Sequence, residues 1–246
     1  MNTALVCMAK NEEYYIQEWI TYHHKLGFNN IIIYANDWNY LNTSQGVKVI
    51  RFNGSCQQTK IYNSFLNNYS KDYNWVAFFD VDEFLVLKQH NNIQSFLTEY
   101  EDCNAIGINW CIFGNNNHTK VINDNYNVLS RFTRRNKELY KPNEHIKTIV
   151  KIPTSSTQDI HNVNGLWFNL NKEIRSGPFN SPVDWSVAQL NHYFTKSDEE
   201  FLLKCNRGRA DIETKRIYSE YLDYLNANEI EDLTALNFFT QEKIGL

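Results

Sequence analysis

The sequence predicts an α/β fold in which helices flank an open, twisted and mostly parallel β-sheet. Residues 3–8 and 30–35 are short, continuous apolar runs, the pattern of parallel strands that are buried on both faces. Between them, residues 16–23 place apolar side chains at helical spacing, and residues 75–79 form a third apolar run. Strands alternating with helices in this way form βαβ units, and the polar residues after each strand are expected at one edge of the sheet.

The helix of the first βαβ unit has signals at both ends. We expect Asn11 to cap it, because an asparagine side chain can accept a hydrogen bond from a backbone amide of the first turn. Glu12 and Glu13 would lie near the positive end of the helix dipole. Gly27 is expected to end the helix, because glycine readily adopts the left-handed conformation of a C-terminal cap.

Later elements follow from the same kinds of pattern. Periodicity predicts strands over 47–52, 105–113 (interrupted by Trp110) and 146–152, and helices over 57–69 and 93–100. Residues 153–182 have little periodicity and are expected to form loops and short hairpins. Ser197 and Glu200 form a capping box that starts another helix, and residues 218–239 have an amphipathic, helical pattern.

Composition argues against several classes of protein. The net charge of −4 disfavours a nucleic-acid partner, because such proteins normally carry a basic excess on one face. The five cysteines are widely spaced and form no C-x-x-C pair, so neither a disulfide framework nor a zinc site is expected. No apolar run reaches the ~18 residues that a membrane-spanning helix needs. We therefore expect a cytoplasmic protein without a transmembrane segment; peripheral association with the inner face of the membrane stays open.

Two acidic residues follow the third apolar run directly. Asp80 and Asp82 would point to the same face if the strand continued through them, because side chains alternate along a strand. Carboxylate oxygens are hard ligands that suit Mg²⁺ or Mn²⁺. The pattern therefore predicts a divalent-metal site at the edge of the sheet, although an isolated Asp-x-Asp is common and acidic residues also cap strand ends.

Several motifs together resemble one known group of enzymes. They are Lys10-Asn11-Glu12, Glu18-Trp19-Ile20 with His23, Leu26-Gly27, the run from Trp75 to Phe84, Trp110 with Phe113-Gly114, and His192-Tyr193 with Lys196-Ser197. Over residues 3–210 the chain is similar to the GT-A glycosyltransferases of the family 2-like and family 92-like groups. The resemblance implies a Rossmann-like GT-A fold, a nucleotide-sugar donor, a divalent metal held by the Asp-x-Asp motif, and transfer to an acceptor hydroxyl, usually with inversion.

The resemblance also suggests how the chain is divided. We expect a single domain, in which residues 1–88 form the nucleotide-binding half, residues 89–210 an irregular acceptor-side half, and residues 211–246 a helical tail that packs outside the sheet or covers the site. The donor is expected to be a UDP-sugar. The acceptor is expected to be a glycan or glycolipid, in the synthesis of a cell-surface polysaccharide or lipopolysaccharide.

The resemblance, together with the positions of residues at the strand ends, also suggests metal and donor residues. The metal ligands are expected to be Asp80, Asp82 and His192, with His161 as the alternative histidine; a hydrogen-bonded loop histidine is the competing interpretation for both. Donor contacts are expected from Ala9, Lys10, Asn11, Glu12, Asn36, Asp37, Lys60, Asp80, Lys196 and Arg207. Any one of these lysines could instead be a solvated surface charge.

The general base that an inverting transfer needs is not determined by the sequence. Asp184, beside Trp185, is one candidate, and Glu83 is another, although Glu83 would alternate away from Asp80 and Asp82 in a continuing strand. Glu144 and Asp159 also lie in predicted loops, and the Glu-Asp pair typical of family 2 has no clear counterpart here.

Tryptophans are candidate platforms for an acceptor sugar. Trp110 and Trp185 are the preferred candidates and Trp167 is a third, while burial in the core is the commoner role of this side chain.

Two other functional classes stay open at this point. One is a metal-dependent nucleotidyltransferase or phosphohydrolase, although the chain has no P-loop; the other is a non-catalytic protein that binds a nucleotide sugar or glycan on the same fold.

Overall fold

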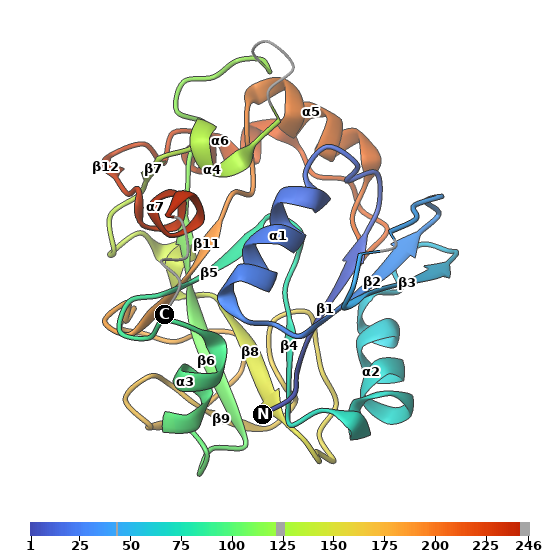
Figure 1. The fold of residues 1–246 in the computed structure, drawn as a ribbon. Coiled ribbons are helices and arrows are strands. Elements are labelled where there is room, and N and C mark those ends of the chain that lie inside the picture. Colours follow the sequence, from blue (N-terminus) through green and yellow to red (C-terminus); the bar gives the residue numbers. More distant parts are fainter. Residues whose placement is uncertain (43, 122–125, 242–246) are drawn as a thin grey trace.

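A curled ten-stranded sheet dominates the part of the chain that the computed structural model describes, residues 1–42, 44–121 and 126–241 (Figure 1). Its main path has the strand order β10-β9-β6-β8-β4-β1-β2-β3, and β11 pairs with both β5 and β6. The strands are β1 (Thr3–Ala9), β2 (Asn30–Asn36), β3 (Val47–Phe52), β4 (Trp75–Phe78), β5 (Glu83–Leu87), β6 (Ala105–Ile112), β8 (Ile146–Lys151), β9 (Leu166–Phe168), β10 (Ile174–Ser176) and β11 (Ala188–His192).

The N-terminal part of the sheet is parallel. β1 lies between β2 and β4 and is parallel to both, with Leu5 beside Ile31 and Ala77, and β3 continues the parallel order beyond β2. β8 is antiparallel and joins β4 to β6. The predicted α/β fold, an open and mostly parallel sheet with flanking helices, is thus confirmed.

Helices cover both faces of this sheet (Figure 1). They are α1 (Ile16–Leu26), α2 (Gln58–Asn68), α3 (Ile93–Glu99), α4 (Val128–Arg131), α5 (Asp198–Arg207), α6 (Leu222–Leu225) and α7 (Thr234–Thr240), with 3₁₀ turns η1 (Ser70–Asp72), η2 (Lys141–Glu144) and η3 (Tyr218–Tyr221). None of the helices in the described ranges is long and apolar enough to span a bilayer.

The two faces of the sheet build two apolar cores, because residues of a buried strand alternate between them. Leu5 and Ala77 join the core under α1, whereas Val6 and Phe78 join the core under α2. On the first face, the Trp19 indole of α1 donates a hydrogen bond to the Glu83 carbonyl oxygen at 2.8 Å. This contact holds α1 against β5, directly beside the acidic motif.

Local predictions about helix ends are confirmed in two cases and wrong in one. Gly27 has φ 106° at the C-terminal cap of α1, and Ser197 and Glu200 form the capping box of α5. However, α1 begins at Ile16, so Asn11 does not cap it; Asn11 has φ 53°, and the chain turns at Glu12, whose carbonyl accepts the amide of Ile16.

Two longer elements also differ from the sequence pattern. Trp110 does not interrupt β6, because its ring packs on neighbouring rings while its backbone stays in the ladder. The region 218–239 is not one helix: η3, α6 and α7 are short, and β12 (Ile230–Glu231), which pairs with β7 (Arg134–Arg135), lies between α6 and α7. Tertiary pairing with β7 thus overrides the amphipathic helical pattern.

Candidate active site

A cavity of about 560 Å³ lies where β1, β2 and β4 end. Met8 of β1, Asn36 of β2 and Asp80 after β4 all line it. In Figure 1, α5 lies beyond this end of the sheet, and the segment 208–217 that follows α5 also contributes lining residues. The carboxyl end of an open α/β sheet is the usual place for a ligand, and the volume is that of an ordinary ligand pocket.

The acidic motif forms a turn at the floor of this cavity. β4 ends at Phe78, and the Glu83 amide donates to the Asp80 carbonyl at 3.0 Å, so Asp80 to Glu83 is a turn between β4 and β5. The expectation that Asp80 and Asp82 point to the same face of a continuing strand is therefore wrong. Both carboxylates still line the cavity, but each has its own set of partners.

Asp80 is fully engaged by two side chains. Gln58 donates to Asp80 Oδ1 at 2.8 Å, and the Lys147 ammonium donates to Asp80 Oδ2, also at 2.8 Å. The Lys147 side chain is 1% exposed and also lies 3.6 Å from Glu83 Oε2. Burial alone would lower the pKa of Lys147, but Asp80 and Glu83 raise it above its usual value, so it remains charged.

Glu83 lies beneath the cavity rather than in it. Its carboxylate accepts hydrogen bonds from the Asp80 amide at 2.9 Å and from the Trp110 indole at 2.8 Å. The residue is fully buried, and burial raises the pKa of Glu83 well above its usual range although Lys147 opposes this. These contacts hold the turn and the Trp110 ring in place.

Asp82 joins α5 to the turn. The Lys204 ammonium of α5 donates to Asp82 Oδ2 at 2.5 Å and to the Phe194 carbonyl oxygen at 2.9 Å. Although burial by itself would raise it, Lys204 and His192 hold the pKa of Asp82 well below its usual range. Burial lowers the pKa of Lys204 to about 8, and Asp82 limits that fall.

The other oxygen of Asp82 faces an imidazole. His192 Nε2 lies 3.6 Å from Asp82 Oδ1, and burial lowers the pKa of His192, so the ring is neutral at pH 7. Two donor atoms at this separation suit two neighbouring ligands of one divalent ion that takes its remaining ligands from phosphates and water. Asp82 and His192 fit a metal in this way; Asp80, with both oxygens engaged, fits less well. Within the described residues no group of three or more His, Cys, Asp or Glu is arranged to hold a metal.

The cavity lining is richer in positive charge than the chain. Seven lining residues are Lys or Arg and five are Asp or Glu, whereas the whole chain carries a net charge of −4. Five of the cations come from residues 204–216, here called the cationic segment: Lys204, Arg207, Arg209, Lys215 and Arg216. A cavity with this balance favours an anionic ligand.

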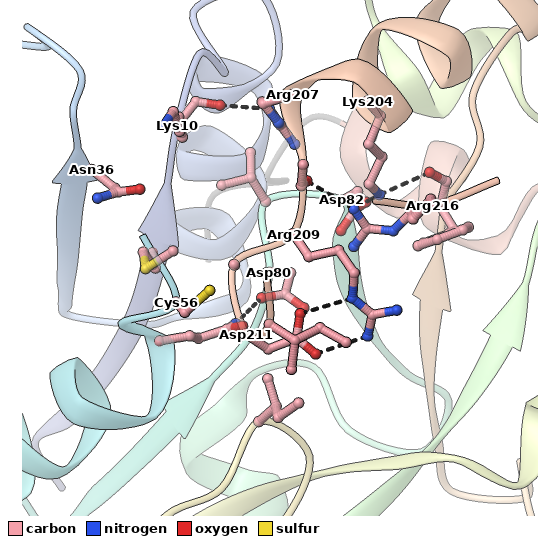
Figure 2. A pocket seen from close by; sticks show the side chains of 18 of the residues that line it. Lys10, Asn36, Cys56, Asp80, Asp82, Lys204, Arg207, Arg209, Asp211 and Arg216 are labelled. Atoms are coloured by element: carbon pink, nitrogen blue, oxygen red, sulfur yellow. Dashed lines mark hydrogen bonds and ion pairs between the residues drawn. The ribbon is translucent and has the colours of Figure 1, made fainter. Parts of the chain in front are cut away.

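Most of these cations already have a carboxylate partner. Arg207 pairs with Glu12 at 2.6 Å, and Arg209 makes two hydrogen bonds to Asp211, at 3.0 and 2.8 Å. Arg216 differs. It is half-buried, it donates to the Gly208 carbonyl at 3.0 Å and it lies 5.5 Å from the Phe194 ring. It forms no ion pair with a carboxylate of the described residues, although Asp82 and Asp211 are near enough to oppose the fall of its pKa. Figure 2 shows it beside Lys204 and Asp82, and burial lowers the pKa of Arg216.

A second part of the lining is uncharged. Trp110, His145 and His161, here called the aromatic cluster, have ring centroids 4.8 Å (Trp110–His145) and 5.1 Å (Trp110–His161) apart. His192 contacts the same indole at 4.3 Å. Burial lowers the pKa of His161 to about 3 and also lowers that of His145, so both rings are neutral at pH 7.

The cavity brings together many, but not all, of the residues predicted from sequence. Those that line it are Lys10, Glu12, Asn36, Asp80, Asp82, Trp110, His161, His192 and Arg207. Those that do not are Ala9, Asn11, Asp37, Lys60, Glu83, Asp184, Trp185 and Lys196. Asp37 pairs with Lys10 at 3.3 Å, and the Lys196 ammonium packs 4.3 Å from the Tyr15 ring.

The three candidate residues near the acceptor side have other partners. Asp184 accepts hydrogen bonds from Asn171 at 3.0 Å and from the Ser186 amide at 2.8 Å. Trp185 is buried and donates to the Trp110 carbonyl at 3.0 Å, and Trp167 is fully buried against Gly107.

Sequence reasoning missed several lining residues, including Gln58, His145, Lys147, Arg209 and Arg216. Lys147 could have been identified from the sequence, because a lysine within the apolar strand run 146–150 needs a buried carboxylate to pair with its charge. Arg209 and Arg216 could not, because they lie in a polar segment without periodicity.

Comparisons with solved structures found several distant likenesses. The S. aureus TarS 1–349 complex with UDP shares 14% identity, over 61% of this chain and 47% of that chain, with a TM-score of 0.39. HddC from Yersinia pseudotuberculosis shares 9% identity, over 83% and 98% of the two chains, with a TM-score of 0.32. The manganese complex of Rv0371c from Mycobacterium tuberculosis H37Rv shares 8%, over 45% and 65%, with a TM-score of 0.31. The chain spans less than half the length of TarS 1–349, and scores this low carry no argument about function.

A comparison with protein families gave a direct result, whereas a search of curated proteins found no match. The model of glycosyltransferase family 92 matches residues 53–233. The matched range contains the acidic turn, the aromatic cluster and the cationic segment, which provide most of the cavity lining. This chain belongs to glycosyltransferase family 92.

Proposed function

We propose that this glycosyltransferase moves a sugar from a nucleoside-diphosphate sugar, a UDP-sugar in the first instance, to a hydroxyl of a glycan or glycolipid. The observation that carries the proposal is the half-buried Arg216, a cation without a carboxylate partner among the described residues, beside Lys204 and the Asp82–His192 pair. A guanidinium in such a place requires an anion, and a diphosphate presents the planar oxygen pairs that arginine binds best.

The donor would lie along the ends of the parallel strands. Asn36 and Glu12 line the β1–β2 side of the cavity, where the nucleoside would bind, and the diphosphate would lie between Arg216 and Lys204. Arg207 is held by Glu12 and by the Lys10 carbonyl, so its main role is to attach α5 to the start of the chain. This arrangement supports a donor whose negative end faces α5.

Asp82 and His192 would hold Mn²⁺ or Mg²⁺. The bound ion supplies positive charge that stabilises the leaving diphosphate. The protonation states support this role, because the pKa of Asp82 is held low and the pKa of His192 is lowered by burial, which leaves a carboxylate and a neutral imidazole at pH 7. Lys204 keeps Asp82 in position from its other oxygen.

The acceptor would approach through the aromatic cluster. Trp110 is 8% exposed and lines the cavity, so part of its ring can contact the apolar face of a sugar. Three further points stay predictions of the family resemblance. They are inversion at the anomeric carbon, action in cell-surface polysaccharide or lipopolysaccharide synthesis, and a location at the cytoplasmic face of the membrane.

Thermal unfolding with a panel of nucleotide sugars tests the proposal. UDP-, GDP-, CMP- and dTDP-sugars are each added with and without Mn²⁺, because a ligand that binds only the folded state raises the melting temperature. We expect one nucleoside diphosphate sugar to raise it, and more so with Mn²⁺. No rise with any donor would contradict the proposal, whereas a rise followed by phosphate release without sugar transfer would favour a phosphohydrolase.

A further inference from the structure

His145 has a position in the cavity that neither the sequence nor the family comparison indicated. It precedes β8 directly, is half-buried and lines the cavity next to Lys147. Its ring stacks on the Trp110 indole, with centroids 4.8 Å apart and planes at 21°. The Trp110 amide also donates to the His145 carbonyl at 2.8 Å, so both the backbone and the ring of His145 are held against β6.

One hydrogen bond determines the tautomer of His145. Its Nδ1 lies 3.1 Å from the Pro142 carbonyl oxygen, and a carbonyl oxygen can only accept, so Nδ1 carries the proton. In the neutral ring, Nε2 then has a free lone pair. Burial lowers the pKa of His145, while the Pro142 hydrogen bond and the Glu144 carboxylate oppose that shift; Lys147 and His161 are the other ionisable groups nearby.

Most other proton acceptors of the lining are already engaged. Those with a cationic partner are Asp80 (Lys147), Asp82 (Lys204), Glu12 (Arg207) and Asp211 (Arg209). His161 has a buried Nδ1 without a partner in the described part of the chain, and its pKa of about 3 makes it a weak base. Glu213 is exposed and lies on the cationic segment, with the groups assigned here to the leaving diphosphate.

We propose that His145 Nε2 is the general base of the transfer, an inference that rests on the proposed function. The acceptor O–H gives its proton to Nε2 while the acceptor oxygen forms a bond to the anomeric carbon. The bond from that carbon to the diphosphate oxygen breaks, and its electron pair leaves with the nucleoside diphosphate. The imidazolium keeps its Nδ1–H bond to Pro142 and then releases the Nε2 proton to water.

The placement of His145 suits this role. Its ring and that of His192 both contact Trp110, with centroid distances of 4.8 and 4.3 Å, so the base lies within reach of a sugar whose diphosphate is held near His192. It also belongs to the aromatic cluster and not to the cationic segment that is assigned to the leaving group. An inverting displacement needs this separation, because the nucleophile attacks from the face opposite to the leaving group.

The first experiment measures hydrolysis of the donor, in which water takes the place of the acceptor. The donor is the nucleotide sugar that raises the melting temperature in the thermal unfolding panel. Loss of a general base typically costs roughly 10²–10⁴-fold in rate. We expect His145→Gln to lower kcat by such a factor while the Kd for the donor stays within twofold. In His145→Ala, added imidazole should restore part of the rate. The matched control is His24→Gln, the same change on a half-buried histidine that does not line the cavity and whose Nδ1 also lies near a backbone carbonyl oxygen, that of Phe28 at 2.9 Å. Its rate should stay close to that of the wild type.

Three results would overturn the assignment: hydrolysis by His145→Gln at the wild-type rate, an equal loss in His24→Gln, or no donor hydrolysis by the wild type. A second measurement needs no turnover. In the intact protein with ¹⁵N-labelled histidine, His145 should be neutral at pH 7, with its proton on Nδ1; a proton on Nε2 or a charged ring would overturn the assignment. If no nucleotide stabilises the wild type, both the proposed function and the assignment of the general base are wrong. If the donor binds and His145→Gln stays active, only the assignment of the general base is wrong.

Discussion

The charged part of the cavity lining and the aromatic cluster differ in how their ionisable side chains are held. In the cationic segment and the acidic turn, charges are kept charged by pairing: Lys204 with Asp82, and Arg207 with Glu12. In the aromatic cluster, burial keeps His145 and His161 neutral. The difference supports the proposed division of the cavity, in which cations bind the diphosphate and a neutral histidine accepts the proton, although the Lys147–Glu83 pair reaches the Trp110 indole.

Among the variants considered, Asp82→Ala should have the largest effect, both on metal-dependent donor binding and on stability. It removes the carboxylate that faces both His192 and Lys204, and breaking a buried ion pair typically costs about 3–5 kcal/mol because the other charge is left unpaired. We expect Mn²⁺-dependent binding of the nucleotide sugar to be lost in calorimetry and the melting temperature to fall.

The double variant Asp82→Ala/Lys204→Met separates these two effects. It removes the unpaired ammonium, so we expect the melting temperature to recover substantially while Mn²⁺-dependent binding stays absent. If Asp82→Ala bound the donor with Mn²⁺ as tightly as the wild type, Asp82 would not belong to the metal site.

Arg216→Gln should have the next largest effect, on affinity alone. A hydrogen bond to a charged group contributes about 1.5–3 kcal/mol, which corresponds to a roughly 10- to 100-fold weaker Kd. We expect this loss for the nucleoside diphosphate and for inorganic pyrophosphate, measured by calorimetry, but not for the nucleoside without phosphates. The control is Lys215→Gln, which removes the same charge from an exposed neighbour. Equal losses in both variants would mean that only the general field of the segment matters.

His161→Gln should have the smallest effect, and on the pH dependence of stability. The folded pKa of His161 is about 3, below the ordinary value of 6.5, so between pH 6.5 and 3 the unfolded chain binds a proton that the folded ring does not. The free energy of unfolding should therefore fall with decreasing pH by at most about 1.4 kcal/mol per pH unit from this group. Urea unfolding at pH 6.5, 5.5 and 4.5 should give a shallower dependence in His161→Gln than in the wild type; identical dependences would show that His161 is not kept neutral by the aromatic cluster.

Local signals in the sequence located most elements that place the site. Gly27 and the Ser197–Glu200 capping box were predicted because each acts within a few residues of the chain. The buried runs of β1, β2 and β4 were predicted because continuous apolar strands belong to the interior of a parallel sheet. Asn11 was expected as a helix cap, but the chain turns at Glu12 first, and short-range propensity could not distinguish these outcomes.

The partners of the acidic residues could not be predicted in the same way. Lys147 and Asp80 are 67 residues apart in sequence, and Lys204 and Asp82 are 122 apart. No periodicity spans such distances, so the sequence indicated that Asp80 and Asp82 belong to a site but not which cations hold them. Arg216 and His145 were missed for the same reason: their importance depends on what does, or does not, lie beside them.

The sequence by itself determined the alternation of strands and helices up to β4, the burial of those strands and the position of the acidic residues at the edge of the sheet, because these depend on propensity and on apolar patterning over short stretches. Tertiary structure decided which charges are paired, which guanidinium lacks a partner and which imidazole nitrogen has a free lone pair. Those properties depend on burial and on distances of a few ångströms between segments far apart in the chain, since electrostatic energies and pKa values change steeply over such distances.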